Sequence, residues 1–544
     1  MSVSRPAAGS DYPRLEAVFP GPPDSLAAAY AAGEPAVRDL FPHLDSWKAR
    51  TWNQPARLPA AAIGTPSGRT RTKLDAIMAG EGFLVTTGQQ PILFGGPLYV
   101  LHKALTAIEA ARRLEIETGK QCLALFWIAS DDHDWAEVAR SRIIDTAGAL
   151  QDFQLPPSPG REAASVGPSP LPEDVLPELH RFIACLPESE FRADVDAVLE
   201  EAYRPGRSYA QAFADFLTSL LPEDGWAWVD SADPAVRLAS EPLLRWALES
   251  RTAAEAAFRE GTAAVESVGF SPQMTYLPGA TQLFCEVNGR RTRVYADLDG
   301  DCLRLGREGD SVSHEDVSRS LAAEPELFSC TASMRPLLES WLLPVGATVL
   351  GPSEVGYWAQ LGPLFEAAEV QMPAVMTRFG WRVIEKRIAR ILDRLHTETE
   401  TLARPDNLAR RLVHDSVPPQ TGQALTELRA ALTAGFDRLE SAIESDLPGL
   451  KASSGKARKG VAGALDSLER AIDSRTREEQ ATVVEQVARA SLHLYPDGDP
   501  QERVLSPFFF AARYGLNFIH SLEELGRDRE IPLLRDVAGS VGQG

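Results

Sequence analysis

The sequence predicts an α/β fold in which a parallel-sheet core carries two connecting insertions and is followed by an α-helical coiled-coil domain. Three observations in the 544 residues support this prediction. Apolar runs at 83–87 and 123–129 enclose a segment, 98–114, with apolar residues at helical spacing, as in a βαβ unit. A third apolar run of this kind lies at 345–350 and begins a second βαβ half. From about residue 381, apolar residues alternate at spacings of four and three, which is typical of a coiled coil.

The first βαβ unit lies in the N-terminal region, 1–150, which we interpret as the first half of the core. Its second strand, LALFWIA at 123–129, is continuously apolar, as expected of a strand covered on both faces in a parallel sheet.

The loop between the first strand and its helix is rich in glycine. It contains Gly88, Gln89 and Gln90 directly after the strand, and Gly95 and Gly96 just before the helix. Bare backbone amides at a helix N-terminus suit an anion. The spacing matches neither the dinucleotide-binding motif nor the P-loop, so a packing turn explains these glycines as well as a phosphate site does.

A cluster of polar residues, SDDHD at 130–134, follows the second strand directly. Open α/β sheets bind ligands at the carboxyl ends of their strands. Asp132, His133 and Asp134 could there hold a divalent cation, transfer a proton or bind a substrate amine. An exposed helix N-cap would explain one aspartate and leave the other polar groups without a role.

Composition and periodicity divide the rest of the chain into further segments. We expect a helical insertion at 151–225, a return to the core at 226–268, a β-rich insertion at 269–335, the second half of the core at 336–380, an antiparallel coiled coil at 381–492, and a C-terminal segment at 493–544 that docks on the core. Asn288-Gly289 predicts a hairpin turn within the β-rich insertion. WAWVD at 226–230 predicts a further strand that delivers Asp230 to the same sheet edge.

The second half of the core contains GPSE at 351–354, between a strand and a helix. Glu354, Tyr357 and Gln360 are spaced to share one helix face, which could point toward a pocket together with Gly351. The alternative is structural, because a proline followed by a glutamate suits the first turn of any helix.

The coiled-coil pattern begins with Ile384, Ile388, Ile391 and Leu395 and continues over two later helical stretches. Because the outer positions are mostly charged, the apolar seam is buried only against a partner helix, in the same chain or in a second subunit. In the tail, Gln501 and Arg503 could line a nucleotide pocket.

The formal net charge of −21 and the pI of about 5.0 argue against nucleic acids and anionic membranes as partners. The five cysteines form no CxxC motif, so we predict reduced thiols and no zinc site. Without an apolar leader or a run of eighteen apolar residues, we expect a cytoplasmic protein.

Five stretches make the chain recognisable: TTGQQPILFGGPLYVLHKA, FWIASDDHDWAEV, GFSPQ with LFCEVNGRRTRV after it, LGPSEVGYWAQL and PQERVLSPFFFAARYG. In these stretches the chain closely resembles the cysteine-adding enzyme family of bacillithiol biosynthesis. The resemblance implies a Rossmann-like core and a homodimer formed through the coiled coil. One departure is RPLLESWLLP at 335–344, where Glu339 and Ser340 replace the usual Gln and Asp of the family pattern, and we assign no role to either residue.

The resemblance implies a ligase that joins the carboxylate of cysteine to the amine of glucosaminyl-malate. Activation of a carboxylate requires phosphoryl or adenylyl transfer, so we expect ATP or another nucleotide, and Mg²⁺ is compatible with that route. In this scheme Asp132, His133, Asp134 and Lys103 are catalytic, and the substrates and nucleotide are bound by Thr87, Gly88, Gln89, Gln90, Gly95, Gly96, His102, Gly351, Glu354, Tyr357, Gln360, Gln501 and Arg503. A non-catalytic, nucleotide-binding dimeric scaffold is the alternative. Metal-dependent hydrolysis lacks the additional ligands that it would need nearby in sequence.

Overall fold

The computed structural model describes residues 12–19, 21–42, 55–157, 161–275, 277–296, 302–519 and 521–522. The chain divides into two compact units. The first comprises Met1–Arg382 together with Glu502–Gly544, and the second comprises Val383–Gln501. The second unit is therefore inserted in sequence between two parts of the first.

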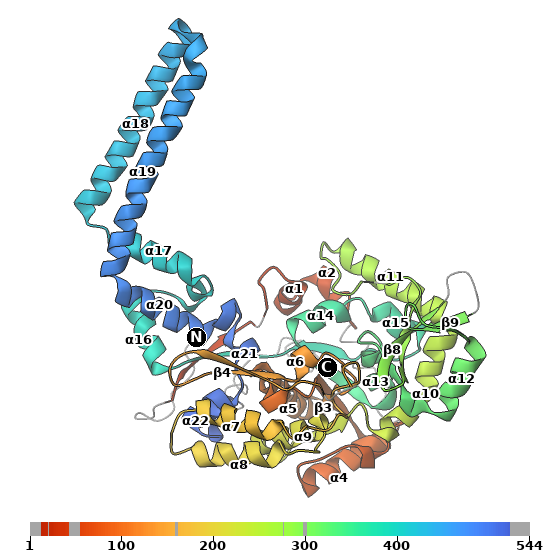
Figure 1. The fold of residues 1–544 in the computed structure, drawn as a ribbon. Helices are drawn as coiled ribbons and strands as arrows, with labels where there is room; N and C mark the ends of the chain where they lie inside the picture. Colours follow the sequence, from red (N-terminus) through yellow and green to blue (C-terminus); the bar gives the residue numbers. More distant parts are fainter. Residues whose placement is uncertain are drawn as a thin grey trace, which may run out of the picture. The chain divides into compact units, whose positions relative to one another are not determined.

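The first unit is built on a five-stranded parallel sheet, which confirms the predicted α/β fold (Figure 1). The strand order is β13 (Ala374–Thr377), β12 (Val345–Leu350), β2 (Gly82–Gln89), β3 (Gln121–Ile128) and β6 (Trp226–Asp230). These strands are almost entirely buried, as the continuous apolar runs in the sequence predict. The strand WAWVD forms β6 with the predicted bounds.

Helix α5 (Tyr99–Thr118) connects β2 to β3 and packs against β2, β3 and β12. Thirteen of its residues are buried, and Gly119 ends it in the left-handed conformation at φ 66°. Because so much of α5 lies inside the protein, even its polar residues His102, Lys103 and Glu109 are buried.

The segment expected to be a helical insertion, 151–225, differs in part from that expectation. At its start β5 (Leu150–Gln154) pairs antiparallel with β4 (Arg140–Ile144) of the preceding segment, and these short strands carry no strong period-two pattern. Three helices follow: α7 (Val175–Cys185), α8 (Arg192–Ala202) and α9 (Tyr209–Leu220). Helix α9 starts with a capping box, in which Ser208 and Gln211 bond each other's backbone.

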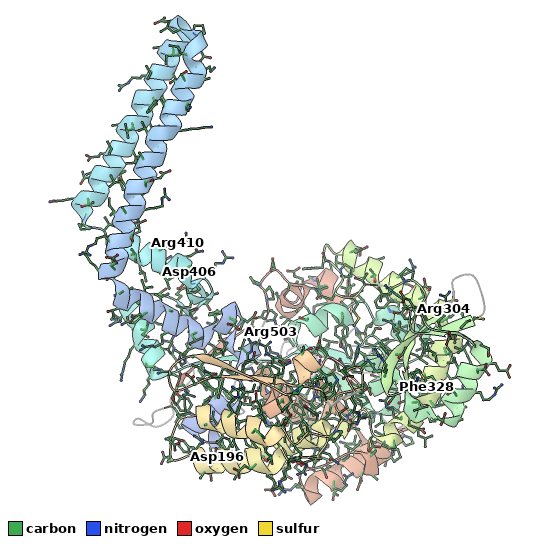
Figure 2. All side chains as sticks on the ribbon, in the orientation of Figure 1. Asp196, Arg304, Phe328, Asp406, Arg410 and Arg503 are labelled. Atoms are coloured by element: carbon green, nitrogen blue, oxygen red, sulfur yellow. The ribbon has the colours of Figure 1, made fainter. Side chains whose placement is uncertain are left out.

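The second insertion is the predicted β-rich segment. After α10 (Pro234–Glu249) and α11 (Arg251–Ser267), an antiparallel sheet has the order β10 (Ser311–Ser313), β9 (Cys302–Leu305), β8 (Arg290–Ala296), β7 (Ala280–Val287) and β11 (Phe328–Cys330). Asn288 at φ 53° and Gly289 at φ 73° form the predicted turn between β7 and β8. Figure 2 labels Arg304 on β9 and Phe328 on β11.

The remaining elements of the first unit complete the core. They are β1 (Arg14–Val18), α1 (Leu26–Ala32), α2 (Pro35–Arg38), α4 (Gly68–Ala76), α6 (Trp135–Val138), α12 (His314–Ala323), α13 (Arg335–Leu342), α14 (Pro352–Trp358), α15 (Gly362–Ala367) and α22 (Phe508–Tyr514). Two elements cross the boundary between the units, β14 (Gly380–Ile384) and α21 (Gln501–Val504).

The second unit contains a small helical core and a long helical hairpin. The core is formed by α16 (Lys386–Leu395), α17 (Pro405–Asp415) and α20 (Ala481–Leu494). Ile388 and Ile391 belong to this core, so the prediction that they start the coiled-coil seam is wrong. The reason is local: His396 adopts a left-handed conformation at φ 47° and ends α16 after ten residues.

The coiled-coil hairpin itself consists of α18 (Pro419–Asp446) and α19 (Lys451–Glu479), which lie side by side in Figure 1. Arg429 of α18 bonds Asp466 of α19 at 2.9 Å, and Arg458 of α19 bonds Glu440 of α18 at 2.8 Å. Figure 2 shows that side chains project into solvent along the length of both helices. In the parts of the chain that the structure describes, no helix combines the length and apolar character needed to cross a membrane.

Candidate active site

A cavity of about 470 Å³ opens at the carboxyl ends of four strands of the parallel sheet. Its lining includes residues that follow each strand: Gln90 (β2), Asp131 and Asp132 (β3), Ser231 (β6) and Glu354 (β12). The chain winds away from the sheet centre in opposite directions at β2 and β12, and open α/β sheets bind ligands beside such a reversal. The volume is that of a small-molecule site. We therefore identify this cavity as the candidate active site.

Lys103 lies beneath the cavity and uses all of its hydrogen-bonding capacity inside the protein. Its side chain donates to the carbonyl oxygen of Gly88, donates to Gln89 Oε1 at 3.2 Å and pairs with Glu354 Oε2 at 2.7 Å. An ammonium group has three donors, so none remains for a ligand. Burial lowers the pKa of Lys103, while the carboxylate of Glu354 opposes that shift. The expectation that Lys103 contacts a substrate anion is therefore not supported, because it instead fixes the wall residues Gln89 and Glu354.

Glu354 forms part of the cavity wall and remains an anion. Its Oε2 also accepts the backbone N–H of Gly351 at 2.8 Å, which caps α14, and its Oε1 lies 3.8 Å from Arg335 Nη2. Burial favours the neutral acid, but Lys103 and Arg335 outweigh it and hold the pKa of Glu354 below its usual value. The structural and functional interpretations of Glu354 are thus compatible, since one oxygen caps the helix while the side chain also lines the cavity.

Arg335 presents a positive charge on the same side of the cavity. Its Nη2 donates to the Tyr357 hydroxyl at 2.7 Å, and its Nη1 pairs with Glu339. Glu339 is buried below Arg335, and burial raises its pKa although Arg335 opposes the shift. Gly88 permits the close approach of β2 to β3 beside this group, because a Cβ there would lie 2.8 Å from the Trp127 carbonyl oxygen. Nothing in the structure explains a serine at the neighbouring position 340.

Carboxylates gather on the side of the cavity that follows β3. Asp132 Oδ2 accepts a hydrogen bond from Gln90 Nε2 at 2.8 Å, and the same amide lies 3.3 Å from Glu137 Oε2. Burial, together with the charges of Asp132 and Asp134, raises the pKa of Glu137. Asp131, by contrast, is neutralised by an ion pair with Arg237. Asp132 is thus the carboxylate of this side that faces the cavity without a cationic partner within 3.5 Å among the described residues.

The other two members of the predicted cluster lie at the rim. His133 is 46% exposed, and its Nδ1 is 3.9 Å from Asp132 Oδ1. Asp134 is the N-cap of α6, where its carboxylate accepts the backbone N–H of Glu137 at 3.1 Å. The helix-cap interpretation therefore describes Asp134, whereas Asp132 and His133 are available to a ligand.

The β-rich insertion supplies a further part of the cavity wall, next to His133. Phe284 on β7 and Arg291 and Arg293 on β8 share one face of that sheet and line the cavity. The Arg291 guanidinium stacks on the Phe284 ring, 3.7 Å from its centroid. It also donates to Ser329 Oγ at 3.0 Å and to the Cys330 carbonyl oxygen at 2.9 Å, and its Nη1 is 3.4 Å from His133 Nδ1.

Several predicted binding residues lie away from the cavity. The Gly95 N–H donates to the Tyr203 hydroxyl at 2.7 Å, and a Cβ at Gly95 would lie 2.4 Å from the Phe216 ring. The Gly96 N–H closes a turn on Leu93. These amides are therefore used in packing, and the prediction that they cradle a phosphate is wrong. His102 is buried with Glu502, at 2.8 Å, and also does not reach the cavity.

The polar residues of the later motifs divide in the same way. Tyr357 lines the cavity, but Gln360 is fully buried and bonds the backbone of Met274 at 2.9 and 3.0 Å. The Thr87 hydroxyl donates to the Val349 carbonyl oxygen at 2.9 Å and so joins β2 to β12.

The two predicted residues of the tail lie in different units. Within the second unit, Gln501 bonds the backbone of Val383 and His493. Arg503 belongs to the first unit and is exposed.

Sequence reasoning overlooked Arg291 and Arg335 as site residues. Both lie within stretches that carry the family resemblance, GRRTRV and RPLLESWLLP, but neither follows a strand of the parallel sheet. Across the described ranges of the chain, no group of three or more His, Cys, Asp or Glu side chains is arranged to hold a metal ion.

Comparison with known proteins matches both parts of the chain. Residues 58–379 match the family described as bacillithiol biosynthesis BshC, N-terminal Rossmann-like domain. Residues 382–527 match bacillithiol biosynthesis BshC, C-terminal coiled-coil domain.

Full-length relatives show the same similarity. A protein of Salinibacter ruber is 26% identical over 93% of this chain and 90% of its own length. Proteins of Heliobacterium modesticaldum and Symbiobacterium thermophilum are 28% and 29% identical, over 92% and 83% of this chain and 92% and 82% of their own lengths. All three bear the name "Putative cysteine ligase BshC".

Proposed function

The chain belongs to the BshC family of bacillithiol biosynthesis, and on this premise we propose that it joins the carboxylate of cysteine to the amine of glucosaminyl-malate. The cavity is the proposed place of reaction. The observation that carries the proposal is that carboxylates, Asp132 and Glu354, and guanidinium groups, Arg291 and Arg335, line the same cavity. Amide formation brings together an amine and a carboxylate, and a cavity with both kinds of charge can hold the two at the same time.

We assign the amine to the side of Asp132. A protonated amine is attracted by this carboxylate and by the nearby Glu137, and it must lose a proton before it can attack an acyl carbon. Gln90 holds Asp132 through a bond of 2.8 Å, so the carboxylate is oriented before the substrate binds. His133 at the rim is suited to pass the released proton to solvent, because nearly half of its side chain is exposed.

The wall formed by Gln89, Glu354 and Tyr357 would position the cysteine. The carboxylate of Glu354 can accept a bond from the cysteine ammonium, and Arg335 beside it can meet the cysteine carboxylate. Lys103 acts in this scheme as a positioning residue, because it holds Gln89 and Glu354 from below.

A carboxylate does not form an amide in water at neutral pH unless it is activated first. A nucleotide such as ATP would supply this activation. The cations Arg291 and Arg335 fit the phosphate charge that such a group brings to the cavity, with Gly88, Gln89 and Gln90 on the adjacent wall. Mg²⁺ would accompany the phosphates as part of the nucleotide.

We further propose that the protein is a homodimer joined through α18 and α19. Leu428 and Leu439 on α18 are 45% and 49% exposed, and Leu468 on α19 is 50% exposed. The antiparallel pairing of these helices therefore leaves apolar side chains in contact with water. A second copy of the hairpin would cover them, and the charged side chains around them suit the rim of such an interface.

The test is incubation of the purified chain with ATP, L-cysteine and glucosaminyl-malate, followed by mass analysis of the product and measurement of ATP consumption. The Asp132→Asn and His133→Ala variants should lose product. Asp134→Asn is the matched control, because its carboxylate caps a helix at the rim. Binding of ATP without product or turnover would instead favour the dimeric nucleotide-binding scaffold.

A further inference from the structure

Two charged residues of the cavity each have an uncharged neighbour one helical turn away. Leu338 follows Arg335 by three residues on α13, and Tyr357 follows Glu354 by three residues on α14. All four side chains line the cavity. Because residues three apart are neighbours on a helix surface, each helix presents a charged group with an apolar surface beside it.

Two further side chains complete an apolar corner of the cavity, which we define as Phe258, Met274, Leu338 and Tyr357. Phe258 on α11 and Leu338 are 4% and 6% exposed, and both belong to the hydrophobic core on which Met274 and Tyr357 also pack. The Tyr357 hydroxyl is bonded to Arg335 Nη2 at 2.7 Å, so the ring supplies the apolar surface of this residue. The four side chains therefore offer a ligand mainly carbon and sulfur atoms.

The backbone of Met274 is held by a fully buried glutamine. Gln360 Oε1 accepts the Met274 N–H at 2.9 Å, and Gln360 Nε2 donates to the Met274 carbonyl oxygen and to Thr262 Oγ1, both at 3.0 Å. Burial of an amide is unfavourable unless its groups are bonded, and here most of that bonding fixes one cavity residue. Gly356 lets the same segment approach α14, because a Cβ there would lie 2.6 Å from Gln273 Cγ. Gln360 is thus a positioning residue for Met274.

Resting on the proposed function, we infer that the apolar corner receives the side chain of the cysteine substrate and selects its thiol against the hydroxyl of serine. In the proposed scheme Glu354 meets the ammonium of the amino acid and Arg335 meets its carboxylate. The ammonium, the carboxylate and the CH₂–SH group are bonded to one carbon atom. A side chain held by way of Glu354 and Arg335 therefore lies beside Leu338 and Tyr357.

The apolar character of the corner accounts for the selection. A thiol behaves as a small apolar group with a weak hydrogen-bond donor, and the thioether of Met274 is a polarisable contact for its sulfur. A serine hydroxyl has a similar shape, but it would lose its hydrogen bonds to water without gaining a partner. We expect a preference for cysteine of roughly tenfold to hundredfold, which an apolar pocket can achieve against a hydroxyl.

The adenine base of ATP is the other large uncharged group that the reaction would bring to the cavity. Adenine carries ring nitrogens and an exocyclic amine, which need hydrogen-bond partners when they leave water. The four side chains of the apolar corner are a poor match for these groups. Glu354 beside the corner would also repel the phosphates that follow the base. The observations therefore favour the cysteine side chain.

The test compares the binding of L-cysteine, L-serine and L-2-aminobutyrate to the full chain by ligand-observed NMR titration under reducing conditions. 2-Aminobutyrate carries a methyl group in place of the thiol, so it should bind within a few-fold of cysteine, whereas serine should bind roughly tenfold to hundredfold more weakly. Met274→Gln introduces an amide of similar length that can bond a hydroxyl. The ratio of cysteine to serine affinity should therefore fall several-fold in this variant.

Two variants serve as controls. Met274→Leu keeps the corner apolar and should keep the ratio of cysteine to serine affinity. Met372→Gln makes the same substitution at another half-buried methionine, which lies outside the described lining of the cavity, and should also keep the ratio. Melting temperatures show whether each variant is folded, and the comparison of the three amino acids on the wild type needs no variant.

Four results would overturn the inference. They are serine binding as tight as cysteine binding in the wild type, 2-aminobutyrate binding as weak as serine binding, no cysteine binding at all, and an unchanged ratio in Met274→Gln. The second result would mean that sulfur itself is recognised and not its apolar character. If Met274→Gln weakens ATP binding while the ratio stays the same, the corner holds the nucleotide base.

The binding titration separates this inference from the proposed function. If the wild type prefers cysteine through Met274 but no product forms from ATP, cysteine and glucosaminyl-malate, the inference stands and the ligase proposal fails. If product forms and Met274→Gln leaves the ratio of kcat/KM for cysteine and serine unchanged, the ligase proposal stands and the inference fails. The expected result is a several-fold fall of that ratio while the KM for glucosaminyl-malate stays the same.

Discussion

Replacement of Lys103 by methionine should destabilise the first unit by about 3 kcal/mol. The side chain is 2% exposed, and methionine fills a similar volume without the charge. Removal of one partner of a buried ion pair costs about 3–5 kcal/mol, because the other partner stays buried without its counter-charge. We expect the lower end of that range, since Glu354 opens on the cavity and water can take up part of the lost interaction.

Because the sequence of the second unit, Val383–Gln501, contains no tryptophan, tryptophan fluorescence during urea unfolding is a suitable assay for the first unit. The signal therefore reports that unit alone, and its midpoint and slope give the change in the free energy of unfolding. The Glu354→Gln variant and the double variant complete a cycle. We expect the double variant to be more stable than the sum of the single losses by about 1–3 kcal/mol, as for other residues in contact.

Two results would refute this reasoning. A loss below about 1 kcal/mol in Lys103→Met would mean that the ammonium is not a buried partner of Glu354. Additive losses in the cycle would mean that Lys103 and Glu354 contribute independently. A matched control is Lys120→Met, because Lys120 is exposed just beyond the end of α5 and should change stability by less than about 0.5 kcal/mol.

Four further outcomes are expected. Asp132→Asn should abolish product formation and leave the melting temperature within a few degrees, as measured by activity and calorimetry. Glu339→Gln keeps an oxygen acceptor for Arg335 but removes a negative charge, so steady-state kinetics should show a several-fold lower KM for an anionic substrate. The pKa of Glu502 is held at about 2 by Arg378 and His102 against burial, so it contributes about 3 kcal/mol above pH 4.5 that is lost as the pH falls toward 2. Glu502→Gln should accordingly be less stable than the wild type at pH 7 and equal to it near pH 2 in urea unfolding. Leu428→Glu should give a monomeric mass by light scattering with helix content retained, and a monomeric wild type would contradict the proposed dimer.

Periodicity identified the core strands because each is a short apolar run covered on both faces. Phe83 to Thr87 and the run ending at Ala129 became β2 and β3 for that reason. The same method failed at Ile388, where a four-three spacing is shared by coiled coils and by any short helix on a globular core. The left-handed turn at His396 is what makes α16 a short core helix and not the start of a coiled coil. A histidine in the sequence does not predict such a turn.

The candidate site was predictable where it follows from strand ends and not where it depends on distant segments. Asp132, Gln90 and Glu354 reach the cavity because parallel strands bring their carboxyl ends to one edge. Arg291 reaches the cavity from an insertion more than 150 residues after Asp132. A pattern of neighbouring residues does not predict a contact between segments that far apart in the sequence. For Lys103 the local pattern was misleading. Its position in α5 predicted a contact with a ligand anion, but the side chain is buried and its ammonium bonds Gly88, Gln89 and Glu354.

The path of the chain between the two units also has a consequence for evolution. Arg378, four residues before the chain leaves the first unit, pairs with Glu502, the first residue after it returns, at 2.6 Å. Everything between them is, for the first unit, one long loop closed by a buried ion pair. The entropy of closing a loop grows only with the logarithm of its length, so a hairpin longer or shorter by several heptads would change the stability of the catalytic unit by only tenths of a kcal/mol. Relatives can therefore vary the length of α18 and α19 together while the cavity stays under separate selection.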